Sequence, residues 1–275
     1  MPVENINVFK SSVKGKRPTN EDVELHVLNL KNDGTAIDNA QASIDLFVIC
    51  DGHGGGAVSA FVAPALQKEF MYKDNIYPLS QTKINNIYDR IQNQLINNES
   101  NIAAKCGTTA LVVIRYNKES KFGLQVINLG DSRAVASING LAVPLTKDHK
   151  PNWPDEQKRI NDVNIATNRV KKIHYNYGDW RIGDLSVSRA FGDLDNVPHV
   201  THIPEIFKYE ITKDYEFIIA ACDGLWDVLA NHLVVNLIKT NINDVMPNDA
   251  RILTGGALSN GSTDNVSVIV IKFAS

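Results

Sequence analysis

Short runs of β-branched and other apolar residues alternate with polar stretches along this chain. Three of these runs, LFVIC, VINLG and FIIAAC, lead directly into Asp51, Asp131 and Asp223, and a fourth, NVSVIVIKF, follows Asp264. Apolar runs of this length, bounded by Gly and Asp, are typical of buried strands. We therefore expect four carboxylates that lie far apart in the sequence to meet at one rim of a sheet.

The remaining pattern predicts further strands and several helices. One or two strands are expected between residues 7 and 30, around a turn at 15–20, and a meander is expected through TTALVVIRY and FGLQVINLGDSRAVAS, with turns at 117–121 and 139–140. Apolar residues at helical spacing predict helices at 58–70, 84–95, 155–161 and 232–240, and a last helix from about residue 248. Pro64 is expected to kink or restart the first helix. Runs of strands, with two helices after the first group and two near the end, predict an α+β fold.

Composition and charge narrow the class of protein. The chain has 275 residues, of which 43% are hydrophobic, and no linker interrupts the pattern, so residues 1–275 are expected to form a single domain. A net charge of -3 without a Lys/Arg-rich block argues against nucleic-acid binding. No apolar run approaches the roughly 20 residues of a membrane span, and the start lacks the apolar stretch of a signal peptide. We expect a soluble, intracellular monomer, in the cytoplasm or the nucleus, that does not bind membranes.

Carboxylates gathered at one rim repel one another. Bound cations, raised pKa values or a wide separation in water relieve that repulsion, and hard divalent cations with oxygen ligands are the usual solution. The pattern therefore predicts a Mg²⁺ or Mn²⁺ site that includes Asp51, Asp131, Asp223 and Asp264. For Asp131, and for Asp193 in SRAFGD, capping of a turn is the alternative, because Asp after Gly often has that role.

The segment DGHGG places an acid, a flexible backbone and an imidazole at one strand end. Gly52 lets the main chain approach a ligand closely, and its carbonyl is a candidate ligand of a hard cation. His53 is a candidate general acid beside the metals, with a structural histidine packed against the turn as the alternative. The other six histidines lack such neighbours, and only His149 in TKDHKP is a further candidate.

A second polar cluster lies in the turn predicted between the first strands. Glu21 and Asp22 are adjacent carboxylates, which in isolation are most often a solvated turn, and Arg17 precedes them by four residues. Arg17 either pairs with these acids or, beside a metal site, binds phosphate, because its planar fork matches two phosphate oxygens.

Several other enzyme classes are unsupported. No Cys is followed six positions later by Arg, so a thiolate phosphatase with a phosphate-binding Cys loop is unsupported, and no HExxH, GxSxG or GxxxxGK[ST] motif occurs. Gly52, Gly54 and Ala57 fit the loose dinucleotide fingerprint G-x-G-x-x-A. Two features argue against dinucleotide binding: Asp51 would place a negative charge beside the pyrophosphate, and the chain lacks the regular alternation of strands and helices of a βαβ fold. Cys50, Cys106 and Cys222 lie in or beside apolar runs and are expected to be buried thiols in a reducing compartment.

Eight motifs occur in order along nearly the whole chain: RPTNED, VICDGHGG, GTTALVV, LGDSRA, DHKP, SVSRAFGD, AACDGLWDV and GSTDNVSVIVI. With them the chain resembles the metal-dependent serine/threonine protein phosphatases of the protein phosphatase 2C type. The resemblance implies a four-layer αββα fold, in which a sandwich of two antiparallel sheets is flanked by pairs of antiparallel helices. It also implies hydrolysis of phosphoserine and phosphothreonine in phosphoprotein substrates, by direct attack of a water that bridges two Mn²⁺ or Mg²⁺ ions.

The resemblance implies ligands for these two ions. Asp51 resembles the residue that bridges both of them. Asp223 and Asp264 resemble further ligands of the first ion, and Glu21 with the Gly52 carbonyl resembles the ligands of the second.

Further roles follow from the same resemblance. Asp22 would hold metal-bound waters, and Asp131 together with Asp223 would bind a weaker third ion. Arg17 resembles the arginine that binds the phosphate, and His53 resembles the acid that protonates the leaving alkoxide.

The segment from about 151 to 181 resembles a flap that borders the cleft. Its pattern is irregular, and RINDVNIATNRV lacks the Gly-rich turn expected there. A rival hypothesis is a catalytically inactive binding module that keeps the fold. Such a module would have lost at least one metal carboxylate, whereas Glu21, Asp51, Asp223 and Asp264 are all present. The sequence therefore favours an active phosphatase.

Overall fold

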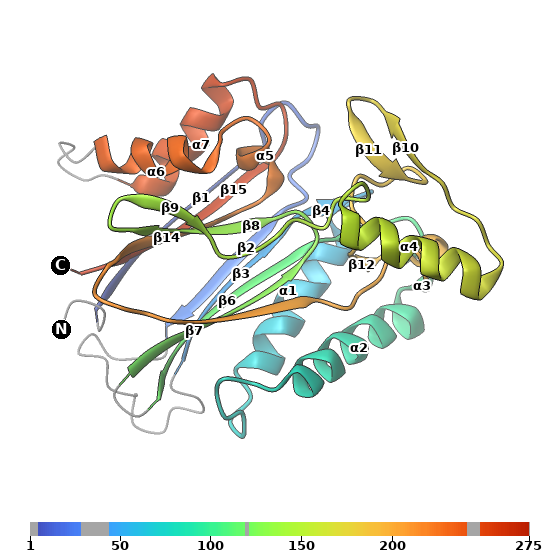
Figure 1. The fold of residues 1–275 in the computed structure, drawn as a ribbon, viewed down its shortest axis with the longest axis horizontal. Helices are drawn as coiled ribbons and strands as arrows, with labels where there is room; N and C mark the ends of the chain where they lie inside the picture. Colours follow the sequence, from blue (N-terminus) through green and yellow to red (C-terminus); the bar gives the residue numbers. More distant parts are fainter. Residues whose placement is uncertain (1–4, 29–43, 119–120, 241–247, 275) are drawn as a thin grey trace.

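Two antiparallel sheets form the centre of the molecule (Figure 1). The computed structural model describes residues 5–28, 44–118, 121–240 and 248–274. The strand order is β1-β15-β14-β8-β9 in one sheet and β13-β7-β6-β3-β2 in the other. The strands of the first sheet are β1 (Ile6–Val13), β15 (Val266–Phe273), β14 (Tyr215–Ala221), β8 (Arg133–Ile138) and β9 (Leu141–Pro144). Those of the second are β13 (Glu205–Glu210), β7 (Lys121–Leu129), β6 (Ala110–Lys118), β3 (Ile44–Cys50) and β2 (Val23–Leu28).

The two sheets pack against each other through alternate side chains. Along β3, Phe47 and Ile49 enter the core between the sheets, while Leu46 and Val48 face the helices on the outer side. Every residue of β3 is buried, because the strand is covered on both faces. The apolar run LFVIC therefore has no polar alternation.

Pairs of helices cover the outer faces of the two sheets (Figure 1). The second sheet is covered by α1 (Ala57–Phe70) and α2 (Gln81–Asn98), and the first by α6 (Asn231–Thr240) and α7 (Asp249–Ser259). Each of these four helices lies where the sequence predicted it. The α+β fold class and the sandwich flanked by helices are confirmed.

Helix α1 differs from the prediction at one point. It continues through Pro64 as one helix, so the predicted restart does not occur. Val62, Ala63 and Leu66 are fully buried beside the proline. Their packing holds the helix against the sheet and outweighs the hydrogen bond that proline cannot make.

The predicted turns are largely confirmed. Strands β1 and β2 flank the turn predicted at 15–20, and Asn139 and Gly140 have positive φ values of 50° and 77° between β8 and β9, as a two-residue hairpin turn requires. The turn predicted at 117–121 includes residues 119–120, which lie outside the described residues.

The segment predicted to be irregular is more ordered than expected. It contains α4 (Pro154–Thr167), which is longer than the predicted 155–161, and a hairpin of β10 (Ile173–Asn176) and β11 (Asp179–Ile182). Ile160 and Glu156 of α4 are buried, and the Glu156 carboxylate accepts hydrogen bonds from Arg159, Arg189 and Ser188. These tertiary contacts extend the helix beyond its weak sequence pattern.

Short elements complete the fold near one end of the sandwich. A small sheet has the order β12-β5-β4, and its strands are β12 (Phe191–Gly192), β5 (Gly107–Thr108) and β4 (Gly52–His53). The short helices are α3 (Ser100–Ala103), η1 (Leu194–Asn196) and α5 (Asp223–Trp226). Within the described ranges, no helix combines the length and apolar character needed to cross a membrane.

Candidate metal centre

The strand ends identified in the sequence meet in a cleft of about 220 Å³. All the predicted site residues except Glu21 and Asp22 line it. The full lining is Arg17, Asp51, Gly52, His53, Thr109, Asp131, Arg181, Asp184, Leu185, Ser186, Val187, Asp223 and Asp264. The expectation that carboxylates distant in sequence meet in space therefore holds.

Hydrogen bonds of the Asp51 main chain hold this residue in place. Its carbonyl accepts hydrogen bonds from the Thr109 amide at 2.9 Å and the Thr108 hydroxyl at 3.0 Å, and its amide donates to the Thr109 hydroxyl at 3.1 Å. The neighbouring Gly52 approaches the backbone of Glu21 so closely that a Cβ there would collide with the Glu21 carbonyl oxygen. Glycine is required at this position to bring the two loops together.

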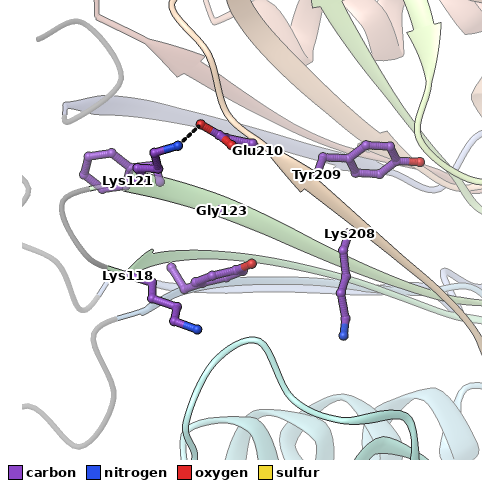
Figure 2. Close-up of a pocket in the computed structure, with 8 residues that line it drawn as sticks. Lys118, Lys121, Gly123, Lys208, Tyr209 and Glu210 are labelled. Atoms are coloured by element: carbon purple, nitrogen blue, oxygen red, sulfur yellow. Dashed lines mark hydrogen bonds and ion pairs between the residues drawn. The ribbon is translucent and has the colours of Figure 1, made fainter.

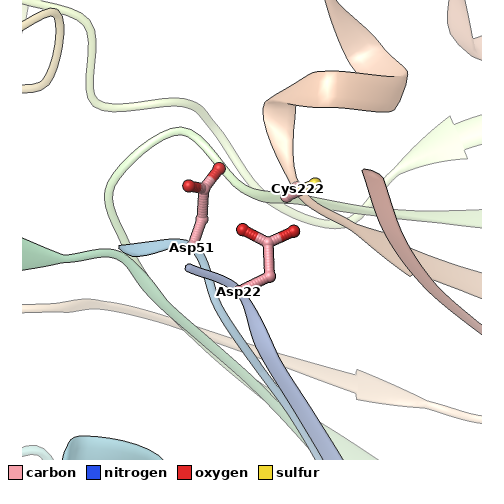
Figure 3. A group of neighbouring side chains, drawn as sticks. All are labelled: Asp22, Asp51 and Cys222. Atoms are coloured by element: carbon pink, nitrogen blue, oxygen red, sulfur yellow. The ribbon is translucent and has the colours of Figure 1, made fainter. Parts of the chain in front are cut away.

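Asp22 lies beside Asp51 (Figure 3). Ligand atoms of Asp22, Asp51 and Cys222 all lie within 4.8 Å of one another. Asp22 is buried, and neither of its carboxylate oxygens has a hydrogen bond of good geometry among the described residues, although Ser267 and Cys222 lie close enough to favour its charged form. Burial raises the pKa of Asp22 from 3.8 to about 6. A buried carboxylate without partners is costly unless a cation or a bound water satisfies it.

Cys222 is a poor ligand despite its position. Burial and the charges of Asp22 and Asp51 raise the pKa of its thiol well above the ordinary value, so the sulfur keeps its proton. The Cys222 sulfur also accepts a hydrogen bond from the Ser267 amide at 3.2 Å. The available ligands are therefore oxygens, which suits a hard cation.

The cysteines fit their predicted role with one exception. Cys50 and Cys222 are buried thiols, as predicted. Cys106 is only half-buried, because it lies beside the DGHGG loop, where its thiol donates to the Gly54 carbonyl at 2.6 Å.

Burial and mutual repulsion raise the pKa values of carboxylates in the cleft. Burial, followed by the charges of Asp223, Asp22 and Asp131, raises the pKa of Asp51 well above its ordinary value. Burial and the charges of Asp131 and Asp227 do the same to Asp223, which begins α5. In the absence of cations these groups would hold protons, and bound divalent cations would remove the repulsion.

Asp131 and Asp227 belong to the same acidic group and interact with Lys150. Asp227 follows Asp223 by four residues, which is about one helical turn. This spacing would have indicated from the sequence that Asp227 is a further member of the acidic group. The Lys150 ammonium lies 2.5 Å from Asp131 Oδ2 and 3.4 Å from Asp179 Oδ2, which belongs to β11. Although burial disfavours its charge, the neighbouring carboxylates raise the pKa of Lys150. Asp131 is therefore paired with a cation of the chain itself and does not cap a turn.

Arg17 pairs with Asp264 and not with the acids of its own turn. Its Nη2 lies 2.6 Å from Asp264 Oδ2, and 58% of the Arg17 side chain is exposed. The Asn265 side chain donates to the carbonyls of Lys14 and Thr19, and its Oδ1 accepts from the Glu21 amide at 2.8 Å. Asn265 thus ties the first turn to the segment before β15, which places Arg17 at the rim of the cleft.

Glu21 lies beside the DGHGG loop, outside the cleft lining. Its Oε2 accepts a hydrogen bond from the Gly55 amide at 2.9 Å, and its Oε1 accepts from the Thr19 hydroxyl at 3.1 Å. Its carbonyl accepts from the Ser59 hydroxyl at 2.5 Å. The second predicted ligand group therefore lies on the side of the cleft where β2 begins.

His53 is partnered by Asp193, a residue for which capping of a turn was one interpretation. Its Nε2 lies 2.7 Å from Asp193 Oδ2. Burial opposes the charge of His53, but Asp193 outweighs it and raises the pKa of His53 above the ordinary value. The other candidate histidine, His149, is buried and accepts a hydrogen bond from the Gly130 amide at Nδ1, so it has a structural role.

A larger hollow of about 470 Å³ lies at the opposite ends of β6 and β7 (Figure 2). It is lined by Tyr116, Lys118, Lys121, Phe122, Gly123, Lys208, Tyr209 and Glu210. Among the described residues that line it, Glu210 is the one carboxylate and is paired with Lys121 at 3.1 Å, and none is a histidine. Despite its size, the described lining of this hollow lacks the cluster of carboxylates that a divalent metal site requires.

Removal of the Asp22 charge is expected to stabilise the metal-free protein above pH 6. Because the folded pKa of about 6 exceeds the ordinary 3.8, the folded state binds more protons than the unfolded chain between these values, and this group lowers stability as pH rises through them. Asp22→Asn should therefore be more stable than the original protein by on the order of 2 kcal/mol at pH 7 and by little at pH 4.

Urea unfolding of EDTA-treated protein between pH 4 and 8 measures this difference. Asp162→Asn, which removes an exposed carboxylate from α4, is the matched control. Its difference in unfolding free energy from the original protein should not increase with pH. A difference for Asp22→Asn that shrinks or stays constant as pH rises would contradict the assignment.

Comparison with known proteins agrees with this geometry. The chain matches the protein phosphatase 2C family over residues 6–266. It is 51% identical to a PP2C-like domain-containing protein of Acanthamoeba polyphaga mimivirus, over 58% of this chain and 98% of that protein. It is 37% identical to probable protein phosphatase 2C 52 of Oryza sativa subsp. japonica, over 96% of this chain but only 50% of the rice protein.

The fold is shared with solved structures. The crystal structure of serine-threonine phosphatase 2C from Toxoplasma gondii superposes with a TM-score of 0.74 at 21% identity, covering 99% of this chain and 98% of that one. Because the family match extends over nearly the whole chain, the chain belongs to the protein phosphatase 2C family.

Proposed function

We propose that this protein is a metal-dependent phosphoprotein phosphatase that hydrolyses phosphoserine and phosphothreonine by direct attack of water. One observation carries the proposal. Asp22, Asp51 and Asp223, from three separate parts of the chain, gather beside one cleft that also presents Arg17 and His53. Phosphoryl transfer needs charge neutralisation, a positioned phosphate and an acid for the leaving group, and these residues can provide all three.

The carboxylates are suited to two Mn²⁺ or Mg²⁺ ions. Asp51 would contact both, with Asp223 and Asp264 for the first ion, and Glu21 and the Gly52 carbonyl for the second. The lack of a well-formed hydrogen bond to the buried Asp22 carboxylate among the described residues and the raised pKa of Asp51 support this fit, because both are the expected cost of the acidic group without its cations. When bound, such ions supply an activated water as nucleophile and neutralise charge on the phosphoryl group.

Arg17 and His53 act on the two ends of the phosphate ester. The Arg17 guanidinium is mostly exposed and uses one nitrogen to hold Asp264, so its remaining N–H groups are available to phosphate oxygens. His53 donates a proton to the departing oxygen of serine or threonine, which is a poor leaving group as an alkoxide.

The hairpin β10–β11 is proposed to contact the phosphoprotein substrate. Arg181 of β11 lines the cleft, and Tyr175, Tyr177 and Trp180 of the same hairpin are exposed. Aromatic side chains that remain exposed beside a cleft suit contact with a peptide flanking the phosphorylated residue. These observations support a role for this hairpin as part of the expected flap.

A weaker third ion at Asp131 and Asp223 would compete with Lys150. The ammonium already lies 2.5 Å from Asp131, so a divalent cation has to displace it or bind against its charge. Lys150→Met is therefore expected to tighten the weak site about tenfold, because a nearby like charge is removed. Calorimetric titration with Mg²⁺, after the tighter sites are filled, measures this affinity.

Lys147→Met, which removes an exposed ammonium three residues away, is the control and should leave the weak site unchanged. Unchanged or weaker third-ion binding in Lys150→Met would contradict competition by Lys150.

The proposed function is tested by phosphate release from a phosphothreonine peptide with Mn²⁺, with Mg²⁺ and with excess EDTA. Turnover that needs either ion and stops with EDTA is the expected result. Folded protein without turnover under any of these conditions would overturn the proposal in favour of an inactive binding module.

A further inference from the structure

We propose that Asp193 is a positioning residue for His53, holding the imidazole so that its other nitrogen serves the leaving group. This inference rests on the proposed function and adds an Asp–His pair to it. It concerns the orientation of the ring and the site on the ring that carries the transferred proton.

The contact between the two side chains is short and isolated. His53 Nε2 lies 2.7 Å from Asp193 Oδ2, and the Asp193 side chain is 1% exposed. Its other oxygen, Oδ1, has no hydrogen-bond partner among the described residues. A buried carboxylate is costly to maintain, and here its one side-chain hydrogen bond within the described ranges is to His53. The arrangement is therefore specific to the imidazole.

The small sheet β12-β5-β4 brings the pair together. His53 of β4 and Gly192 of β12 both lie opposite Gly107 of β5, one on each side, and Asp193 directly follows Gly192. A Cβ at Gly107 would collide with Asp193 Oδ2 and lie 2.5 Å from His53 Nε2. The two side chains thus meet over the one residue of the central strand that has no side chain.

Local backbone geometry at Asp193 supports the same role. Asp193 has φ 49°, in the left-handed region that few residues other than Gly adopt readily. It precedes η1 but makes no side-chain capping hydrogen bond, so the turn-capping alternative for Asp193 is wrong. Its carboxylate contacts the imidazole and no backbone amide of the turn among the described residues.

The pairing determines which nitrogen can act. With Nε2–H donated to Asp193, Nδ1 is the one ring nitrogen left to protonate the substrate oxygen. As water attacks phosphorus and the P–O bond to serine or threonine breaks, the Nδ1 proton moves to the departing oxygen. The ring then remains as the neutral Nε2–H imidazole, still bound to the carboxylate, and takes its next proton from water.

Asp193→Asn tests this role with little disturbance of shape, since Asn tolerates the left-handed region. We expect kcat on a phosphothreonine peptide to fall about 10- to 100-fold, and kcat on an aryl phosphate, whose leaving group needs little protonation, to fall less than about threefold. In the His53→Ala background, Asp193→Asn should cause no further loss, because its effect passes through the imidazole.

Two further variants sharpen the result. Gly107→Ala should reproduce the selective loss on the peptide by separating the pair. Asp195→Asn, an equal charge change at an exposed position two residues away, should leave both activities unchanged. Equal losses on both substrates, or additive losses with His53→Ala, would overturn the proposal.

A spectroscopic readout separates failure of this inference from failure of the proposed function. In nitrogen-15 spectra of the histidine rings, the signal lost in His53→Gln should report an Nε2-protonated ring and should change in Asp193→Asn. A His53 ring signal that does not respond to Asp193→Asn overturns the pairing, whether or not the protein hydrolyses phosphopeptides.

Discussion

Asp51→Asn is expected to abolish metal-dependent phosphate release, with a loss of at least about a thousandfold in kcat. Asp51 is the proposed ligand that both ions would share, and the charges of Asp22, Asp131 and Asp223 all act on it. An amide at this position keeps the size of the side chain but removes the one charge that both cations would share. Losing several kcal/mol of charge stabilisation corresponds to such a decrease in rate.

The fold should survive this change. The backbone of Asp51 is held by Thr108 and Thr109, and its side chain makes no hydrogen bond that the substitution would break within the described residues. Thermal unfolding of the metal-free variant should therefore occur at or above the temperature of the original protein, because repulsion is reduced. Asp89→Asn, at an exposed position on α2, is the activity control. Near-normal turnover in folded Asp51→Asn would remove the central role of this residue.

His53→Ala is expected to lower kcat on phosphoserine and phosphothreonine peptides by about 10² to 10⁴, the usual contribution of a general acid. On an aryl phosphate the loss should be much smaller, because the leaving group departs without a proton. The comparison of the two substrates in one preparation is the measurement, and metal binding should be unchanged.

His232→Ala, which removes an exposed imidazole from α6, is the matched control and should affect neither substrate. Equal losses on both substrates in His53→Ala would count against general-acid catalysis and favour a structural role for the imidazole.

Most of the fold was accessible from the sequence because its core strands are buried on both faces. The runs that end at Asp51, Asp131 and Asp223 have no polar alternation, and this marks them as central strands whose ends carry the acids. Amphipathic periodicity likewise located α2 within a few residues, although it did not indicate the Ser80 cap at the start of the helix. Local pattern and tertiary burial agree in these elements.

The parts that escaped prediction depend on contacts between distant segments. Asp193 follows Gly and resembles a turn cap, and its partner His53 lies 140 residues earlier. Lys150 stands in an otherwise polar stretch, and its place beside Asp131 depends on the connection after β9. The length of α4 likewise depends on the contacts of buried Glu156 with Arg159 and Arg189. Neither periodicity nor composition reports such pairings.

Calorimetric titration of Mn²⁺ into the metal-free protein, repeated on Asp51→Asn, tests the metal centre most directly. The original protein should bind two ions per chain with high affinity and a third more weakly, and Asp51→Asn should lose the two tight sites. Folded protein that binds no Mn²⁺, or an Asp51→Asn variant with both tight sites intact, would contradict the assignment of this cleft as a two-metal centre.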